Sequence, residues 1–443
     1  MRVLRSRKVV TPEGSRAATV HLDGERILRV GAWDDVLEGA ELIDYGQAAI
    51  LPGIVDAHVH INEPGRTEWE GFLTATRAAA KGGVTTIVDM PLNSIPATTS
   101  VDALHRKREA MEGKLAMDVG LWGGAVPGND RVLRDLLDAG VLGFKCFLVD
   151  SGVDEFPRLD EADLLKAMHA LADTGAPLLV HAELPGPLAD ARRSLPSADV
   201  RSYARYVASR PKRAEDEAVE LLHAFCKQTR ARTHVVHLSS SNALATVRAA
   251  KDAGLPFTAE TTPHYLRLES ESIPDGATSF KCAPPIREHE NREALWIGLK
   301  QGVLDSIVTD HSPCTPELKR QELGDFDAAW GGIASLQFGL SVVWTECAAR
   351  GIGLDRIAAW MSEAPARLAG LKRKGAIEAG RDADFAIFDP DARFQVTESL
   401  VEHKNKVTPY MGESLLGVVR ETWLRGERIT DARRGKWLAR GES

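Results

Sequence analysis

The 443-residue chain has few cysteines, no excess of positive charge and no long apolar run. Its five cysteines are odd in number and form no C-x-x-C pair, which argues against a disulfide framework and indicates reduced thiols. A formal charge of -8 gives no electrostatic reason to expect nucleic acid as a partner. No stretch offers the ~18 uninterrupted apolar residues of a membrane span, and the amino end lacks the apolar centre of a signal peptide. We therefore expect a cytoplasmic protein that acts on a small molecule.

Apolar, β-rich runs alternate with amphipathic helical segments from about residue 52 onward. The helical segments carry start and stop signals, as in Glu68 to Lys81 before Gly82-Gly83, and in Glu215 to Thr229 after Pro211. Eight such βα units predict parallel strands closed into a (β/α)8 barrel. The eight apolar runs are IVDAHVH, VTTIVDM, LAMDVGLW, LGFKCFL, PLLVHAE, THVVHLS, PFTAET and DSIVTD.

The two chain ends have a different character. Residues 1–51 contain short strands, including a hairpin around Asp23-Gly24, a turn pair that tolerates positive φ. Residues 366–443 show similar short strands with Gly and Asp turns. We therefore predict that both ends pair into one composite β-sandwich beside a barrel formed by residues 52–365.

Two inserted segments follow predicted barrel strands. Leu184 to Arg210 follows the fifth strand, and His311 to Gly332 follows the eighth. Long polar loops at the carboxyl face of a barrel often cover a ligand. Surface decoration or a subunit contact is an equally open interpretation of these segments.

Metal ligation is the chemistry that the polar residues at the strand ends favour. His58 and His60 lie at i and i+2 of one strand, so their side chains point the same way. The carboxyl ends of parallel strands converge on one mouth, where imidazole and carboxylate groups can bind zinc or a similar cation. His234 is expected to point to the opposite face from His237 and to pack against a helix. The other polar groups at strand ends are Lys145, His181, His237 and Asp310.

Lys145 can join a metal site only after chemical change, because an ammonium nitrogen has no free lone pair. Carboxylation by CO2 turns its amine into a carbamate whose two oxygens can bridge two cations. A hydroxide held between such ions can attack a polarised carbonyl, with Asp310 as general base and then acid. The resulting binuclear arrangement places His58, His60 and Asp310 on one ion, and His181 and His237 on the other.

Long sequence blocks resemble those of the cyclic amidohydrolases, and among these the allantoinases. The resemblance covers nearly the whole chain. It implies a (β/α)8 barrel with a β-sandwich, two divalent ions bridged by carboxylated Lys145, hydrolysis of the hydantoin ring of allantoin to allantoate, and a homotetramer. Zinc is the expected metal, with Co, Mn, Fe or Ni as alternatives. The blocks are LPGIVDAHVHINEPGRTEWEGF, GGVTTIVDMPLNSIPATT, GFKCFLVDSGVDEFP, VVHLSS, ETTPHYL, KCAPPIRE, VTDHSPC and AWGGIASLQ.

Departures from related sequences narrow the substrate. Dihydroorotase-like sequences place an Arg where this chain has Asn62, and a neutral amide there suits an uncharged ring. Hydantoinase-like and dihydropyrimidinase-like sequences place a Tyr shortly after the lysine, whereas residues 147–150 read FLVD. Asn93 and Ser312 match ligand-binding positions of the family and are expected to contact substrate. A hydantoinase or dihydropyrimidinase activity is the alternative, and a non-catalytic scaffold is a further one.

Overall fold

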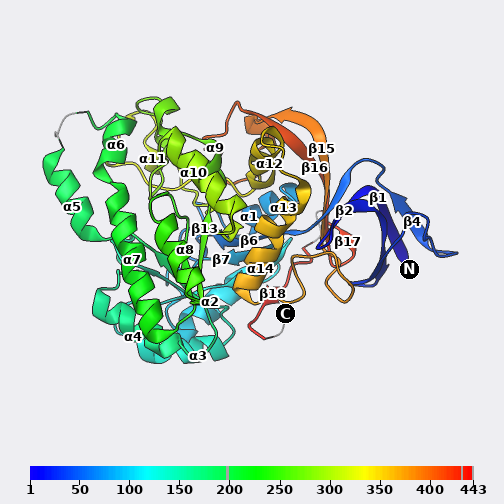
Figure 1. Cartoon of the computed structure of the whole chain (residues 1–443), viewed down its shortest axis with the longest axis horizontal. Coiled ribbons are helices and arrows are strands. Elements are labelled where there is room, and N and C mark those ends of the chain that lie inside the picture. Colours follow the sequence, from blue (N-terminus) through cyan, green and yellow to red (C-terminus); the bar gives the residue numbers. More distant parts are fainter. Residues whose placement is uncertain (196–198, 431–432, 442–443) are drawn as a thin grey trace.

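The computed structural model describes residues 1–195, 199–430 and 433–441 (Figure 1). Eight parallel strands alternate with helices, as the sequence predicts, and the third strand is interrupted at Trp122. The strands are β6 (Ile54–Val59), β7 (Val84–Asp89), β8 and β9 (Asp118–Leu121, Gly123–Gly124), β10 (Phe144–Phe147), β11 (Leu178–His181), β12 (Thr233–Val235), β13 (Phe257–Thr261) and β14 (Ser306–Ile307). The helices between and after them include α1 (Phe72–Lys81), α2 (Val101–Met111), α3 (Leu133–Asp138), α4 (Glu161–Leu171), α7 (Lys212–Thr229), α8 (Leu244–Asp252), α9 (Pro263–Arg267), α10 (His289–Lys300), α12 (Gly339–Ala349), α13 (Leu354–Ala358) and α14 (Ala364–Ala369).

The eight strands form two parallel sheets that meet at two seams. One sheet runs β14-β13-β12-β11-β10-β9, and the other contains β8, β7 and β6. At one seam the backbone N–H of Leu142 donates to the carbonyl of Leu121 (2.9 Å). At the other seam the N–H of His60 donates to the carbonyl of His311 (2.8 Å). The fold is the predicted (β/α)8 barrel with a β-sandwich.

Helix α1 begins later than the sequence predicts. Its first residue is Phe72 and not Glu68, because Gly71 has a φ of 106°, which no helix residue adopts. The preceding residues form a turn in which the N–H of Trp69 bonds to the carbonyl of Arg66. The prediction for α7 was closer, since Pro211 immediately precedes the helix and residue 229 ends it.

Both chain ends form one eight-stranded sheet, in which amino-terminal strands (blue in Figure 1) lie beside carboxyl-terminal strands (orange to red). Strand β5 joins the two halves, since it pairs with β1 and with β15. Apolar residues from both ends pack into one cluster. The strands are β1 (Arg2–Thr11), β2 (Gly14–Asp23), β3 (Arg26–Gly31), β4 (Glu41–Asp44), β5 (Ala49–Pro52), β15 (Phe385–Gln395), β16 (Ser414–Leu424) and β17 (Glu427–Arg428).

The end of the chain returns to the barrel. Strand β18 (Trp437–Leu438) pairs in parallel with β8, so part of the carboxyl-terminal segment adds a strand to the barrel sheet. Part of that segment, residues 431–432 and 442–443, lies outside the described residues. The division of the chain into domains at residues 51 and 366 stays a prediction.

The first inserted segment is not the long polar loop that the sequence predicts, whereas the second is mostly loop. The first contains helices α5 (Pro185–Ser194) and α6 (Tyr203–Ser209), and residues 196–198 of it lie outside the description. The second contains the short helix α11 (Pro316–Lys319). The two segments pack against each other. The ring centroid of Phe326 in the second segment lies 5.3 Å from that of Tyr203 and 5.8 Å from that of Tyr206, both in the first.

A buried ionic cluster joins the barrel to the β-sandwich. Lys374 Nζ lies 2.7 Å from Asp118 of β8, 2.9 Å from Asp382 and 2.7 Å from Asp384, and the last two residues lead into β15. Arg425 adds a second cation beside Asp118. These three carboxylates lie close enough together to hold a cation, and the Lys374 ammonium already supplies it.

Replacing Lys374 should destabilise the fold strongly. The variant Lys374→Met leaves buried carboxylates facing one another without their shared cation, at an expected cost of about 3–5 kcal/mol in free energy of unfolding. Urea unfolding followed by circular dichroism measures this difference. The control Lys8→Met removes the exposed ion pair between Lys8 Nζ and Asp391, whose atoms lie 3.5 Å apart, and should lower the free energy of unfolding by about 1 kcal/mol or less. Equal effects of both variants would contradict the role given to the cluster.

Candidate metal centre

One cavity of about 650 Å³ opens at the carboxyl ends of the barrel strands. Its wall is formed by strand ends together with both inserted segments. The structure therefore brings together all the predicted metal ligands and both predicted substrate contacts. Those lining residues are His58, His60, Asn93, Lys145, His181, His237, Asp310 and Ser312.

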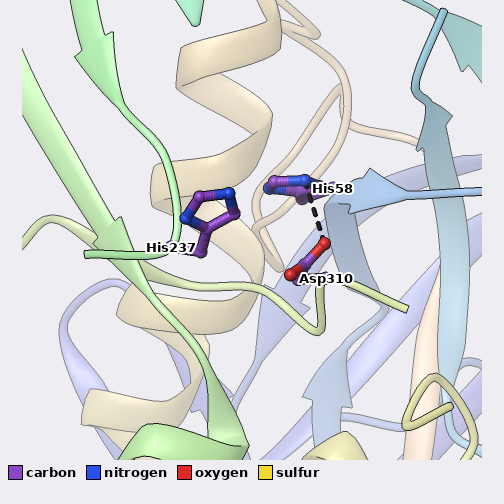
Figure 2. Close-up of side chains that lie close together, drawn as sticks. All are labelled: His58, His237 and Asp310. Carbon is purple, nitrogen blue, oxygen red and sulfur yellow. Dashed lines mark ion pairs between the residues drawn. The ribbon is translucent and has the colours of Figure 1, made fainter. Parts of the chain in front are cut away.

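His58, His237 and Asp310, which all line this cavity, lie close together (Figure 2). One possible ligand atom from each lies within 4.8 Å of the others. Asp310 Oδ1 lies 3.1 Å from His58 Nε2 and 3.6 Å from His60 Nε2. His181 completes the group, since its ring centroid is 4.7 Å from that of His237. Four imidazoles and one carboxylate thus converge on a small buried volume.

Burial prepares these imidazoles for ligation. Removal from water lowers the pKa of His60 to about 4 and also lowers the pKa values of His181 and His237. Neutral imidazoles keep the nitrogen lone pair that a metal ion needs. Burial acts on His58 in the same direction, but the Asp310 and Glu260 carboxylates together outweigh it and raise the pKa of His58.

Lys145 is fully buried in β10, and its Nζ has no hydrogen-bond partner among the described residues. Burial lowers the pKa of this amine to about 8. A larger share of the side chain is therefore neutral near pH 7, and only the neutral amine is a nucleophile toward CO2. His60 Nδ1 and His237 Nδ1 are also buried without a hydrogen-bond partner in the described part of the chain.

Strained backbone holds two of the candidate ligands. His237 has a φ of 36° and Asp310 a φ of 46°, in the left-handed region that side chains other than glycine rarely adopt. Asp56 holds the backbone next to Asp310, since its carboxylate accepts hydrogen bonds from the N–H and hydroxyl of Thr309. Such strain persists only where surrounding contacts fix it, and it is typical of functional sites.

Glu260 of β13 orients His58, and sequence reasoning missed it. Its Oε1 accepts a hydrogen bond from His58 Nδ1 (2.6 Å), which leaves His58 Nε2 facing Asp310. Burial alone raises the pKa of Glu260, but His58 and His234 outweigh it and hold this pKa at about 2. His234 does not pack against a helix as predicted, because its Nε2 lies 3.0 Å from Glu260 Oε2 and its Nδ1 lies 2.8 Å from Thr258 Oγ1.

The two predicted substrate contacts are available for binding. Asn93 has a left-handed φ of 59°, and its side chain and that of Ser312 line the cavity. Within the described part of the chain, neither side chain forms a hydrogen bond, although Arg66 Nη1 donates to the backbone carbonyl of Asn93 (2.7 Å). Asn62, in contrast, does not line the cavity, and its Nδ2 donates to the carbonyl of Pro313 (3.4 Å). Asn62 therefore has no direct contact with the cavity through which its amide could favour an uncharged substrate.

Aromatic residues surround the imidazoles. Phe147 stacks on His181 with ring centroids 4.6 Å apart and planes at 15°. Tyr206 also lines the cavity, but its hydroxyl donates to the carbonyl of Cys282 (2.7 Å). Asp150 lies at the wall near the position where hydantoinase-like sequences have their tyrosine.

The sequence pattern of the amidohydrolase family matches residues 49–429. The chain belongs to the amidohydrolase family. It is 54% identical to the allantoinase of Streptomyces avermitilis over 428 residues, which cover 96% of this chain and 95% of that one. It is 44% identical to the allantoinase of Saccharomyces cerevisiae over 441 residues, which cover 96% and 94%.

Solved structures agree with this assignment. The L-hydantoinase (dihydropyrimidinase) of Arthrobacter aurescens superposes with a TM-score of 0.92 at 29% identity over 99% of both chains. A dihydropyrimidinase of Brevibacillus agri superposes with a TM-score of 0.89, also at 29% identity, over 99% of this chain and 98% of that one. Amidohydrolases use divalent metal ions, and the cluster of imidazoles with a carboxylate fits such ions in this chain.

Within the described residues, no helix is both long and apolar enough to cross a membrane.

Weakening the contact between Glu260 and His58 should loosen metal binding. In Glu260→Gln the side chain keeps its size but loses the charge that orients the imidazole, and metal affinity should fall about 10–100-fold. Elemental analysis after dialysis against a series of chelator concentrations measures the change. Glu346→Gln, which alters a carboxylate paired with Arg267 away from the cavity, is the control. If the wild type, Glu260→Gln and Glu346→Gln all lose metal at the same chelator concentration, Glu260 does not orient His58 for metal binding.

Proposed function

We propose that this protein is an allantoinase, which opens the hydantoin ring of allantoin by adding water across a cyclic C–N bond. The observation that carries the proposal is the presence of all six predicted ligand residues in one buried cavity of a chain 54% identical to an allantoinase. A scaffold without activity is disfavoured, because such a protein has no reason to keep the whole set.

The same six residues are proposed to hold two divalent ions. His58, His60 and Asp310 would bind one ion, His181 and His237 the other, and carboxylated Lys145 would bridge them. When bound, the ions polarise the ring carbonyl and lower the pKa of the attacking water. Zinc is the proposed metal, since it accepts imidazole and carboxylate ligands together.

Carboxylation of Lys145 resolves the problem of a buried amine among metal ligands. The ammonium group first loses one proton, the neutral nitrogen then attacks CO2, a C–N bond forms as one C=O π bond opens, and a second proton leaves the nitrogen, so that a cationic side chain becomes an anionic one. Support comes from the lowered pKa of Lys145 and from the lack of a hydrogen-bond partner for its Nζ among the described residues. The resulting oxygens are metal ligands, whereas an ammonium group in the same place would repel cations.

Asp310 is proposed as the catalytic base and acid. Burial raises its pKa, but the neighbouring imidazoles of His58, His60 and His237 outweigh burial and keep this pKa well below its usual range, so the carboxylate is ionised. Asp310 would take a proton from the attacking water and give it to the ring nitrogen as the C–N bond breaks. Asn93 and Ser312, which both line the cavity, would hold the substrate by hydrogen bonds.

A hydantoinase or dihydropyrimidinase activity is the second candidate. It is favoured by the close superposition on the two solved enzymes of that type. It is weakened by FLVD at residues 147–150, which lacks the tyrosine of those sequences. Because the ring chemistry is the same, only substrate preference separates the two candidates.

The proposal extends to assembly and location. We infer a homotetramer from the family resemblance, and a scattering measurement of mass in solution tests it. All five cysteines are unpaired and buried, which supports work in the reducing cytoplasm. The small-molecule substrate requires neither nucleic acid nor a membrane.

Lys145→Ala should lose nearly all activity. Mutation of a residue that orients a metal ligand lowers metal affinity or activity about 10–100-fold. Removal of the bridging ligand itself should therefore lower the turnover of allantoin more than ~100-fold. Short carboxylic acids added to the assay should restore part of the rate, because they can supply the missing oxygens. Lys166→Ala, at an exposed position of α4, is the control. Undiminished turnover by Lys145→Ala would exclude the bridging role.

Substrate preference should favour allantoin. Enzyme with a measured metal content is incubated with allantoin, hydantoin and dihydrouracil, and ring opening is followed by appearance of the carboxylate product. Allantoin should turn over fastest, a chelator should abolish the rate, and added metal should restore it. Rapid opening of hydantoin or dihydrouracil without turnover of allantoin would show that the substrate is wrong and the reaction class right.

A further inference from the structure

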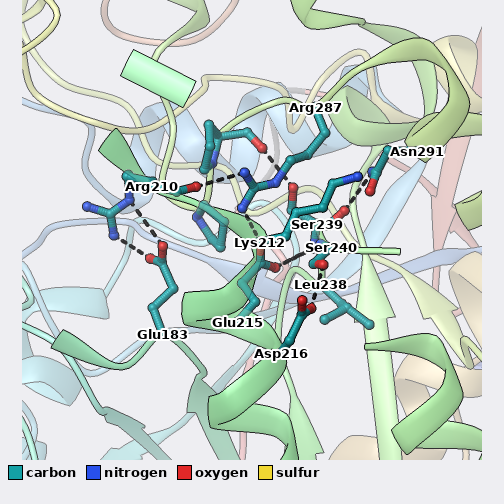
Figure 3. A network of polar contacts seen from close by, with 12 residues as sticks. Glu183, Arg210, Lys212, Glu215, Asp216, Leu238, Ser239, Ser240, Arg287 and Asn291 are labelled. Carbon is teal, nitrogen blue, oxygen red and sulfur yellow. Dashed lines mark hydrogen bonds and ion pairs between the residues drawn. The ribbon is translucent and has the colours of Figure 1, made fainter. Parts of the chain in front are cut away.

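Figure 3 shows a chain of buried ionic contacts that the chemistry proposed above does not need. We name it the ionic chain and define it as Glu183, Arg210, Arg287 and Glu215. Glu183, Arg287 and Glu215 do not line the cavity among the described residues, although Arg210 does. Burying so many charges is unfavourable unless each is paired, so their arrangement calls for a role.

One end of the ionic chain holds His181. Glu183 Oε2 accepts a hydrogen bond from His181 Nε2 (2.8 Å), which turns the other ring nitrogen of His181 toward the cavity. Arg210 pairs with both oxygens of Glu183, through Nε at 3.2 Å and through a second, shorter contact. Burial raises the pKa of Glu183, but Arg210 and His181 outweigh it and hold this pKa at about 2. The carboxylate is therefore ionised and its geometry fixed.

The guanidinium of Arg287 connects the two ends. Its Nη1 donates to the carbonyl of Arg210 (2.7 Å), and its Nη2 lies 2.6 Å from Glu215 Oε1. Arg287 is 3% exposed and Glu215 is 1% exposed. Two nitrogens of one rigid plane thus join the segment that follows β11 to helix α7. A lysine ammonium cannot reproduce both contacts in that planar geometry.

The other end holds the turn that follows His237. Glu215 Oε2 accepts hydrogen bonds from the backbone N–H groups of Ser239 and Ser240, each at 2.9 Å. Asn291 Nδ2 donates to the carbonyl of Ser239 (2.8 Å) and closes the turn from its other side. These contacts fix the backbone two residues beyond His237, whose left-handed φ of 36° needs such support.

We infer that the ionic chain is a positioning device that couples His181 to His237, so that Arg287 and Glu215 set the affinity of the ion that these two imidazoles share. This inference rests on the proposed function, because it assumes the two-ion centre. Glu260 supports the other ion, since it orients His58, and it also accepts a hydrogen bond from the backbone N–H of His237 (3.4 Å). Within the described residues, Glu260 forms no hydrogen bond or ion pair with any of the four members of the ionic chain. The two ions should therefore respond differently to changes in Arg287.

The test removes metal from the holoenzyme stepwise. Wild-type protein and Arg287→Lys are dialysed against increasing dipicolinate, and zinc per chain is measured by elemental analysis. Arg287→Lys keeps the charge but not the planar two-nitrogen contact. One of its two zinc ions should therefore be released at a dipicolinate concentration at least about 10-fold lower than in the wild type, and the other at an unchanged concentration. Arg267→Lys is the matched control, because Arg267 also pairs with a glutamate at 2.6 Å, away from the cavity.

A second variant covers the case in which Arg287→Lys does not fold. Glu215→Gln keeps the shape and one acceptor oxygen while removing the charge, and it should shift the same release step. Unchanged release in both variants, or an equal shift of both steps that Arg267→Lys also shows, would overturn the inference. Wild-type protein that binds fewer than two ions per chain would instead overturn the proposed function.

Discussion

Ionisable side chains buried face to face at the carboxyl ends of the strands are the constraint on which the rest of this molecule depends. Taking imidazole, amine and carboxylate groups out of water is unfavourable unless they find partners. Asp310 is such a partner for His58 and His60, yet Lys145 Nζ and His237 Nδ1 have no hydrogen-bond partner among the described residues. Divalent cations and the proposed carboxylation of Lys145 would satisfy this arrangement.

The surrounding structure serves to hold that arrangement still. Separate carboxylates orient the two sides of the centre, Glu260 behind His58 and Glu183 behind His181. Asp56 fixes the turn before Asp310 through Thr309. Away from the cavity, the cluster around Lys374 joins barrel and β-sandwich, so that strand ends from a long chain keep one relative placement.

Sequence reasoning could find the barrel and the ligands because both follow from local patterns. Alternating apolar runs predict βα units, and polar residues such as Lys145 and Asp310 stand out at the strand ends. Glu260 could not be found in this way, because its contact with His58 spans 202 positions and depends on which strands are neighbours. His234 was misjudged for the same reason, since Glu260 on the adjacent strand replaced the expected helix as its partner.

Other errors have different causes. The positive φ of Gly71 delays α1, a restriction that periodicity does not reveal. The first inserted segment was predicted as a loop because its apolar residues face those of the second segment, as Tyr203 faces Phe326, and give no regular stripe in the first segment alone.

A crystal structure with anomalous data collected at the zinc absorption edge tests the central claim most directly. The account predicts two anomalous peaks in the cavity, one beside His58, His60 and Asp310 and one beside His181 and His237, with continuous density extending from Lys145 Nζ to both. A bare lysine side chain with no anomalous peak, in crystals grown from fully active protein, would contradict it.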